Sequence, residues 1–348
     1  MYYHPSYIED LRTLRKYVPG LEMLRGETIL VTGATGLIGS AVVDFLMQMN
    51  IDEDAGIRIL AAGRDERRLQ KRFSGRICPE FFPFEAAALL REEEWPQTLP
   101  KYIIHAAGSA NPAMYSSHPV DTMMTTICGM RSMLSLAAAR KDSRLLFISS
   151  SEVYGKKDTT DPFPEDVFGE VNILNPRSCY PVSKRAAETL CASAGSQYEV
   201  DFVIMRPGHI YGPTMTAGDN RASSQFPRDV AAGKDIILKS EGKQIRSYCY
   251  VLDCVTAALT VLFQGESGTA YNVSNRNSIA TIREMAEAFA KAAGRKIIFE
   301  LPTQKEKEAF NPMDNSSLDA RRLETLGWKG FFDLDTGVRR TLACLKPF

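Results

Sequence analysis

The sequence carries no excess of charge of either sign, because 42 lysines and arginines balance 42 aspartates and glutamates in 348 residues. A protein that binds nucleic acid or anionic membranes through bulk charge carries a marked positive excess. We therefore expect neither partner, although a local phosphate site stays open. Long uncharged apolar runs and a secretory-signal pattern are also missing, which predicts a cytoplasmic protein outside the membrane.

Histidine and paired cysteine are scarce as well. The four histidines show no H-x-x-x-H spacing, and the seven cysteines are odd in number, scattered and without C-x-x-C spacing. Metal sites need such ligand clusters, and a disulfide framework needs paired cysteines in a secreted chain. The sequence therefore predicts reduced thiols and no metal centre. Its length suits one large α/β domain and a smaller one.

Glycine is concentrated in residues 27–40, ETILVTGATGLIGS, where a short apolar strand precedes a helical pattern. Gly33 permits a tight strand-to-helix turn, Gly36 lets a pyrophosphate approach the backbone, and Gly39 lets the helix pack closely on the strand. The helix N-terminus offers free N–H groups and the positive end of its dipole to a phosphate. We predict a dinucleotide site made by Gly33, Thr35, Gly36, Leu37, Ile38 and Gly39.

An acidic residue is missing at the end of the second predicted strand, residues 58–62. Such a residue, roughly 20 positions beyond the last glycine, usually holds the ribose hydroxyls of NAD. Residues 61–63 are Ala-Ala-Gly, followed by Arg64 and Asp65. Arg64 could accept the 2′-phosphate of NADP, Asp65 could fold back onto a ribose, or the pair could cap a helix in solvent. The choice between NAD and NADP stays open at this point.

Two further patterns carry chemistry. A predicted buried strand at 144–148 runs into three serines and a glutamate at 149–152, and Tyr180 precedes Lys184 by four residues. Ligands bind at the carboxyl ends of strands in an open parallel sheet, and residues four apart share a face of a helix. A free tyrosine has a pKa near ~10 and is a poor base. A neighbouring ammonium and a cationic nicotinamide would lower that pKa, so the pair predicts a general base.

The sequence resembles the extended short-chain dehydrogenases/reductases, the NAD-dependent nucleotide-sugar epimerases, dehydratases and UDP-glucuronate decarboxylases, from about residue 28 to residue 328. The resemblance rests on TGATGLIG at 32–39, HAAG at 105–108, SSSEVYG at 149–155, YPVSK at 180–184, RPGHIYGP at 206–213 and LGW at 326–328. It implies an α/β fold, namely a doubly wound parallel (Rossmann) sheet with a smaller C-terminal α/β lobe that binds the substrate.

The expected domain organisation follows from the same resemblance. We expect an N-terminal helical extension over residues 1–25, a dinucleotide-binding domain over 26–205 to which 244–264 return, and a substrate-binding lobe over 206–348. In the extension, Ser6 opens a helical pattern whose apolar residues are Tyr7, Leu11, Leu14 and Val18. This predicts a surface helix packed on the domain, with a dimer contact or a cover over the substrate edge as alternatives.

Catalytic roles are implied by position in the resembled family. Ser150 would hydrogen-bond the sugar hydroxyl that is oxidised, Tyr180 would remove its proton, and Lys184 would hold the cofactor ribose. Glu152 falls where dehydratases and decarboxylases carry a second acidic group. Ser151 stands where 4,6-dehydratases carry an aspartate, so it does not complete their acid–base pair.

Binding roles are implied in the same way. Ala106 and Ala107 would let the nicotinamide half of the cofactor lie across the strand ends. His209 replaces an asparagine that touches the substrate, which would alter specificity or be a structural exchange. Arg246 matches an arginine that grips the nucleotide diphosphate bidentately, and a solvated arginine on an edge strand is the alternative. His105 is expected to be a packed histidine at a strand end.

The resemblance implies a reaction through a 4-keto sugar. Epimerisation then needs only rotation of the keto sugar and return of the hydride, whereas decarboxylation needs a 6-carboxylate and groups that hold it. Residues 169–180, GEVNILNPRSCY, resemble the decarboxylases, but no match to the arginine that those enzymes supply is found near 317–320. We therefore place a UDP-sugar 4-epimerase first, with a UDP-glucuronate decarboxylase or a dehydratase as the alternative.

Two other classes stay open. A dinucleotide-sensing regulator without turnover typically lacks the tyrosine–lysine pair, so Tyr180 and Lys184 argue against it, whereas Arg64 keeps an NADP-dependent carbonyl reductase open. An epimerase returns its hydride and has no need to exchange cofactor, so we expect resident NAD, with NADP as the alternative. The expected partners are a UDP-linked sugar and a second copy of the chain in a homodimer.

Overall fold

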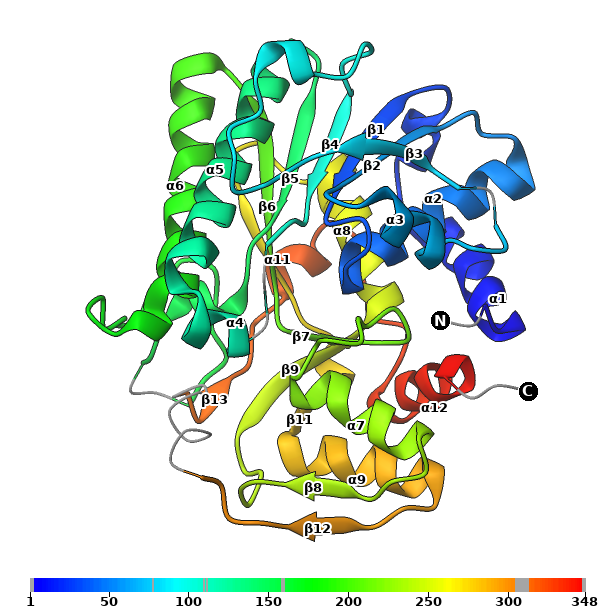
Figure 1. Cartoon of the computed structure of the whole chain (residues 1–348), viewed down its shortest axis with the longest axis vertical. Coiled ribbons are helices and arrows are strands. Elements are labelled where there is room, and N and C mark those ends of the chain that lie inside the picture. Colours follow the sequence, from blue (N-terminus) through cyan, green and yellow to red (C-terminus); the bar gives the residue numbers. More distant parts are fainter. Residues whose placement is uncertain are drawn as a thin grey trace.

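A seven-stranded parallel sheet forms the larger part of the computed structural model, which describes residues 3–76, 78–108, 110, 112–157, 160–303 and 313–345 (Figure 1). The strand order is β10-β6-β5-β4-β1-β2-β3. The strands are β1 (Thr28–Thr32), β2 (Arg58–Gly63), β3 (Glu80–Pro83), β4 (Tyr102–His105), β5 (Arg144–Ile148), β6 (Asp201–Pro207) and β10 (Ala270–Val273). This confirms the expected doubly wound sheet.

Helices cover both faces of the sheet (Figure 1). Successive side chains of a strand point to opposite faces, so Ile29 and Val31 of β1 enter the hydrophobic core under one helical layer and Leu30 enters the other. The first layer contains α2 (Leu37–Glu53) and α8 (Val251–Gln264), and the second contains α5 (Pro119–Ala138) and α6 (Cys179–Tyr198). The short helices α3 (Glu66–Arg72) and α4 (Pro112–Ser117) follow β2 and β4.

The smaller part is an α/β lobe below the sheet in Figure 1. Its central strand, β9 (Ile245–Tyr250), pairs with β7 (His209–Tyr211), β11 (Ile279–Thr281) and β13 (Asn315–Ser316). A separate pair joins β8 (Ile236–Leu238) to β12 (Ile297–Phe299). Three helices, α7 (Ala222–Ala231), α9 (Ile282–Ala293) and α12 (Leu334–Leu345), pack against one another in the lobe, and α11 (Arg321–Glu324) packs on β10.

The division between the two parts differs from the expected ranges. The return to the sheet domain begins at α8 rather than at residue 244, because β9 pairs within the lobe. It also includes β10, which the range 206–348 had assigned to the lobe. A parallel strand beside β6 needs a crossover connection, and α8 lies in that crossover.

The N-terminal extension forms α1 (Pro5–Leu14) and a 3₁₀ turn at Arg15–Tyr17. The helix begins at Pro5, one residue before the expected start, because the His4 ring caps it by accepting a hydrogen bond from the Ser6 N–H. Tyr7, Leu11 and Leu14 are buried, and the helix packs on α2, α8 and α12. The prediction of a helix packed on the domain is confirmed.

A buried aspartate on α2 ties the extension to the sheet domain. The Asp44 carboxylate accepts hydrogen bonds from the hydroxyls of Tyr3 (2.7 Å) and Tyr7 (3.0 Å). It also forms an ion pair with Arg72 of α3 at 2.5 Å. The carboxylate has no exposed surface, so it depends on these three partners for its solvation.

Three further properties bear on function. No helix in the described part of the chain has the length and apolarity needed to cross a bilayer. All seven cysteines are free thiols, and five of them are buried. Across the described ranges, no group of three or more histidine, cysteine, aspartate or glutamate side chains is arranged to hold a metal ion.

Candidate active site

The turn between β1 and α2 allows no side chain at two of its glycines. Gly33 has a φ of +66°, and a Cβ there would lie 2.7 Å from the Ala106 carbonyl oxygen. A Cβ on Gly39 would lie 2.3 Å from the Gly33 carbonyl oxygen. Gly36 is the N-cap of α2 and has no side chain to cover the N–H groups of the first helical turn. The turn therefore brings backbone without covering side chains to a helix N-terminus, which suits a pyrophosphate.

The neighbouring residues of the turn divide into two groups. Thr35 and Ile38 are partly exposed beside the glycines. Leu37 is buried in the core, and its carbonyl accepts a hydrogen bond from Thr214 Oγ1 at 2.7 Å, so its side chain serves packing. Ala106 and Ala107 follow β4 next to Gly33, and the Ala107 N–H donates to Thr32 Oγ1 at 3.0 Å. They form a floor of small side chains beside the turn.

The end of β2 does not supply a ribose-binding carboxylate. The Asp65 carboxylate accepts hydrogen bonds from the N–H groups of Arg67 (2.9 Å) and Arg68 (3.3 Å), so it caps α3. The Arg64 side chain is 72% exposed, with the Glu85 carboxylate 3.9 Å away. The capping alternative thus holds for Asp65, and Arg64 is a solvated charge.

Ser150, Tyr180 and Lys184 come together at the carboxyl end of β5. Tyr180 lies in the first turn of α6 and Lys184 one turn later, so both side chains face the sheet. The Lys184 ammonium donates to the Ile148 carbonyl oxygen at 2.7 Å. Ser150 follows β5, and its hydroxyl lies close enough to the Tyr180 hydroxyl to lower the pKa of Tyr180. The structure therefore groups these three predicted residues.

Burial determines the ionisation of this pair. It raises the pKa of Tyr180 to about 12, although the hydrogen bond from Ser150 acts in the opposite direction. Burial also lowers the pKa of Lys184 to about 8, opposed by the charge of Glu188. In the protein without cofactor, desolvation of the phenolate outweighs the groups that lower this pKa. The lowering expected from the ammonium together with a cationic nicotinamide stays a prediction.

Glu152 lies in a 3₁₀ turn, Ser151–Tyr154, directly after Ser150. Its carboxylate accepts two hydrogen bonds from Arg177, at 2.9 and 3.0 Å, in a bidentate pair that is largely shielded from solvent. The charge of Glu152 raises the pKa of Tyr180, which places the carboxylate close to the phenol. The sequence analysis did not single out Arg177, although it directly follows Pro176 and precedes Tyr180 by three residues.

Tyr115 was also missed. Its ring stacks on the Tyr180 ring, with centroids 4.6 Å apart and an interplanar angle of 12°. The residue is 2% exposed and comes from α4, a six-residue helix whose pattern is too short to predict. The stack restrains the plane of the Tyr180 ring.

His105, by contrast, is a packed histidine, as expected. It is fully buried at the end of β4, with Nδ1 2.8 Å from Thr32 Oγ1 and its ring stacked on Phe147. Burial lowers its pKa to about 3, so it is neutral at physiological pH.

The predicted substrate-binding residues of the lobe form a buried cationic region. Arg246 lies on the central strand β9 and is 3% exposed, so the solvated-edge alternative is wrong. Within the described chain, its hydrogen bonds go to the carbonyl oxygens of Ile245 (2.9 Å) and Asp314 (3.4 Å), not to a carboxylate. A buried guanidinium without an anionic partner is an incomplete site.

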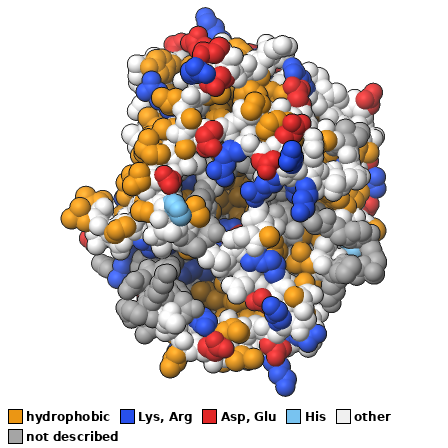
Figure 2. Space-filling view, viewed as in Figure 1, with side chains coloured by type: hydrophobic (Ala, Val, Ile, Leu, Met, Phe, Trp, Pro, Cys, Tyr) orange, Lys and Arg blue, Asp and Glu red, His pale blue; other side chains and the backbone are white. Residues whose placement is uncertain are grey.

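His209 lies in the same region. Its Nδ1 is buried without a hydrogen-bond partner among the described residues. Burial and the charges of Arg246 and Arg221 hold its pKa well below the usual range, so the ring is neutral. Ser151 is buried in the turn next to Glu152. On the face shown in Figure 2, Lys and Arg side chains gather around the hollow between the sheet domain and the lobe.

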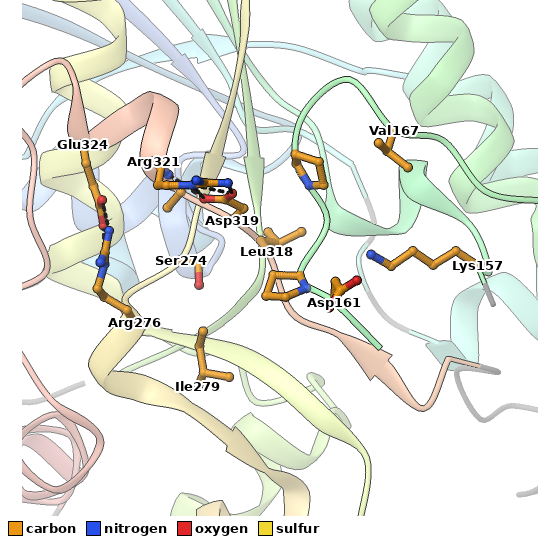
Figure 3. Close-up of a pocket in the computed structure, with 13 residues that line it drawn as sticks. Lys157, Asp161, Val167, Ser274, Arg276, Ile279, Leu318, Asp319, Arg321 and Glu324 are labelled. Atoms are coloured by element: carbon orange, nitrogen blue, oxygen red, sulfur yellow. Dashed lines mark hydrogen bonds and ion pairs between the residues drawn. The ribbon is translucent and has the colours of Figure 1, made fainter. Parts of the chain in front are cut away.

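A separate cavity of about 620 Å³ lies between Lys157 and residues 161–167 on one side and residues 318–324 on the other (Figure 3). Its charged side chains form local pairs, Arg276 with Glu324 and Arg321 with Asp319. None of the predicted site residues lines it. This cavity is not the candidate active site, because it contains neither Tyr180 and Lys184 (the tyrosine–lysine pair) nor the turn at residues 33–39 (the glycine turn).

Comparison with known proteins decides the family. The chain matches the sequence model of the NAD dependent epimerase/dehydratase family over residues 29–274, more than half of its length. It belongs to this family. The match includes the glycine turn, residues 149–154 after β5 (the serine turn), the tyrosine–lysine pair and β9. The similarity to the NAD-dependent epimerase/dehydratase family therefore extends beyond the sheet domain into the lobe.

Relatives within the family resemble the chain over most of its length. UDP-glucuronic acid decarboxylase 3 of Arabidopsis thaliana is 32% identical over 312 residues, which cover 89% of this chain and 86% of the relative. UDP-glucuronic acid decarboxylase 1 of Danio rerio is 31% identical over 337 residues, which cover 96% of this chain and 76% of the relative.

Solved structures confirm the family fold. UDP-glucose 4-epimerase of Thermotoga maritima, solved with UDP-glucose, has a TM-score of 0.76 at 21% identity and covers 90% of this chain and 97% of its own. UDP-glucose 4-epimerase of Thermus thermophilus, in complex with NAD, has a TM-score of 0.75 at 23% identity and covers 91% and 98%. At this identity the likeness concerns the fold.

Proposed function

We propose that this protein is an NAD-dependent nucleotide-sugar decarboxylase that converts UDP-glucuronate to the corresponding UDP-pentose and carbon dioxide. The observation that carries the proposal is the similarity to UDP-glucuronic acid decarboxylases over both the sheet domain and the lobe. It favours the alternative expected from the sequence over the UDP-sugar 4-epimerase that had been placed first.

The residues fit a dinucleotide. Side chains at Gly33 and Gly39 would collide with backbone, and Gly36 at the N-terminus of α2 leaves the first N–H groups of the helix uncovered. Bound there, NAD would supply a hydride acceptor and a positive charge near Tyr180. We take NAD as the cofactor because the solvated Arg64 and the capping Asp65 add no preorganised phosphate site.

Proton transfer is assigned to Tyr180. Its phenolate oxygen would take the proton of the sugar 4-hydroxyl as C4 is oxidised, with the Ser150 hydroxyl close to the same phenolate oxygen and Lys184 held near the ring by the Ile148 carbonyl. Because burial keeps the pKa of Tyr180 at about 12, the phenol is protonated in the protein alone. Proton removal therefore requires the positive charge brought by the cofactor.

The carbon–carbon bond breaks after oxidation. A 4-keto sugar with a carboxylate on C5 is a β-keto acid, so the C5–C6 bonding electrons pass to the C4 carbonyl and carbon dioxide leaves. C5 would then take a proton whose net source is water. Reduction of the C4 carbonyl, with Tyr180 returning its proton to the C4 oxygen, would complete the cycle.

Glu152 and Arg177 are the acid–base and cationic groups that this step needs and that epimerisation does not. Their bidentate pair lies next to Tyr180. Two residues of the lobe are assigned to the UDP diphosphate. Arg246 is buried and has no carboxylate partner among the described residues, and His209 has a buried Nδ1 without a hydrogen-bond partner there.

The test is product mass. Purified protein with NAD and UDP-glucuronate is expected to give a UDP-sugar lighter by one carbon dioxide, whereas UDP-glucose is expected to stay unchanged. Conversion of UDP-glucose to a product of equal mass but different retention would instead establish the 4-epimerase, and loss of water would indicate a dehydratase.

A matched pair of variants isolates the proposed decarboxylation group. Arg177→Gln is expected to lower product formation at least ~10²-fold, as for a positioned catalytic group. Arg276→Gln, which removes an equally paired but exposed arginine facing Glu324, is expected to retain wild-type activity. Equal activities in the two variants would refute the role of the Glu152–Arg177 pair.

A further inference from the structure

Glu188 lies one helical turn beyond Lys184 on α6, on the same face of the helix. Its side chain is only 11% exposed and accepts three hydrogen bonds. Ser149 Oγ donates to Oε1 at 2.6 Å, Arg206 Nε donates to Oε1 at 3.0 Å, and Arg206 Nη2 donates to Oε2 at 2.7 Å. The carboxylate thus connects the catalytic helix to the turn that carries Ser150.

Arg206 extends this connection to the edge of the sheet. It stands on β6, and its Nη1 donates to the Tyr154 hydroxyl at 3.0 Å and to the Glu165 carbonyl oxygen at 2.8 Å. The Tyr154 hydroxyl in turn donates to Asn272 Oδ1 on β10 at 2.6 Å. Tyr154 ends the 3₁₀ turn that contains Glu152, so both ends of the serine turn are held by one network.

The same carboxylate determines the charge environment of Lys184. The titratable groups that face this ammonium are Tyr180, Glu188 and Cys191 on α6 and His105 on β4. Burial raises the pKa values of Tyr180 and Cys191 and lowers that of His105, so these three are neutral at pH 7. Glu188 is the anion that opposes the desolvation of Lys184.

We propose that Glu188 is a positioning residue for the reaction, which holds the serine turn through Ser149 and keeps the Lys184 side chain in its charged form. The inference rests on the proposed catalytic role of Tyr180 and Lys184. It assigns to Glu188 two separable effects, one on geometry and one on charge.

Substitution separates the two effects. Glu188→Gln removes the charge and keeps an acceptor for Ser149. Since Lys184 acts as a cation, activity falls as pH rises through its pKa, and loss of the nearby anion lowers that pKa. The alkaline limb of the kcat/KM profile is therefore expected to move to lower pH by at least ~0.5 unit. Ser149→Ala removes the hydrogen bond but leaves the charge, so it is expected to lower kcat without moving the limb.

The buried Arg206 would be left without its carboxylate partner in Glu188→Gln, which threatens folding. The double variant Glu188→Gln/Arg206→Met removes both charges together and is expected to fold and to show a limb displaced in the same direction by a smaller amount. An alkaline limb that coincides with that of the wild type in both folded variants would overturn the proposal.

A measurement without substrate separates this inference from the proposed function. The titration of Lys184 without substrate, followed by NMR of its ¹³C-labelled side chain with the exposed Lys243 as internal reference, is expected to have a lower midpoint in Glu188→Gln than in the wild type. A displaced midpoint in a protein that converts no UDP-sugar would refute the proposed function alone. An unchanged midpoint would refute the charge effect of Glu188 whatever the activity.

Discussion

The Asp44 carboxylate provides a direct test of what fixes the N-terminal extension. Asp44→Asn removes the charge but keeps the size of the side chain, and it leaves Arg72 beside a neutral amide. Asp44 has no exposed surface and joins Tyr3, Tyr7 and Arg72. Breaking a buried ion pair by removing one partner costs about 3–5 kcal/mol, so we expect a loss of that size in the free energy of unfolding.

The assay is urea unfolding followed by circular dichroism, with Glu80→Gln as the matched control. Glu80 also forms a two-bond pair with an arginine, Arg58, but both side chains are exposed, so its loss is expected to cost no more than about 1 kcal/mol. The double variant Asp44→Asn/Arg72→Met is expected to recover part of the loss because no unpaired charge stays buried. A loss in Asp44→Asn no larger than in Glu80→Gln would refute this reasoning.

Tyr180→Phe is expected to abolish turnover and to leave NAD binding nearly unchanged in a fluorescence titration, because only the proton-transferring hydroxyl is lost; wild-type activity would contradict the assignment. Arg246→Ala is expected to raise KM for the UDP-sugar more than it lowers kcat, and Arg246→Lys to restore little, since one ammonium makes no planar bidentate contact. The pKa of His105 is about 3 in the folded protein and near ~6.5 in the unfolded chain, so the unfolded chain takes up the proton first and stability falls as pH drops below ~6.5. This loss is expected to reach about 2 kcal/mol at pH 5 and to be absent in His105→Asn, as measured by urea unfolding at both pH values. Denatured wild-type protein is expected to release NAD, and Arg64→Ala to weaken NADP binding by less than about tenfold (~1.4 kcal/mol); a larger selective loss would favour an NADP enzyme.

The dinucleotide half of the molecule was predictable because its signals are local. A strand, a glycine turn and a helix are adjacent in sequence, and the steric demands of Gly33 and Gly39 can be written down before any coordinates exist. Tyr180 and Lys184 are four residues apart on one helix, so their common face also follows from spacing.

The rest of the site depends on contacts between distant segments. The pairing of Glu152 with Arg177 and the stacking of Tyr115 on Tyr180 follow from how loops after β4 and β5 meet α6. The raised pKa of Tyr180 depends on burial, which opposes the effect expected from Lys184. Spacing along the chain predicts neither these contacts nor this pKa, because all of them depend on how distant segments pack.

The boundary between the parts was misplaced for a related reason. Residues 245–250 alternate as a strand, and alternation indicates that a strand is half-buried but not which sheet it joins. The edge strand β10 is only four residues long and was not predicted, although it extends the parallel sheet beside β6.

The direct junction of β9 and α8 has a consequence for engineering. Arg246 stands on β9, which ends at Tyr250, and α8 begins at Val251 and packs on α2, the helix behind the glycine turn. A substrate lobe therefore cannot be exchanged between family members as an independent cassette. A chimera that swaps β9 without α8 would place a foreign junction between Arg246 and α2. A working exchange has to carry β9, α8 and β10 together, or keep all three.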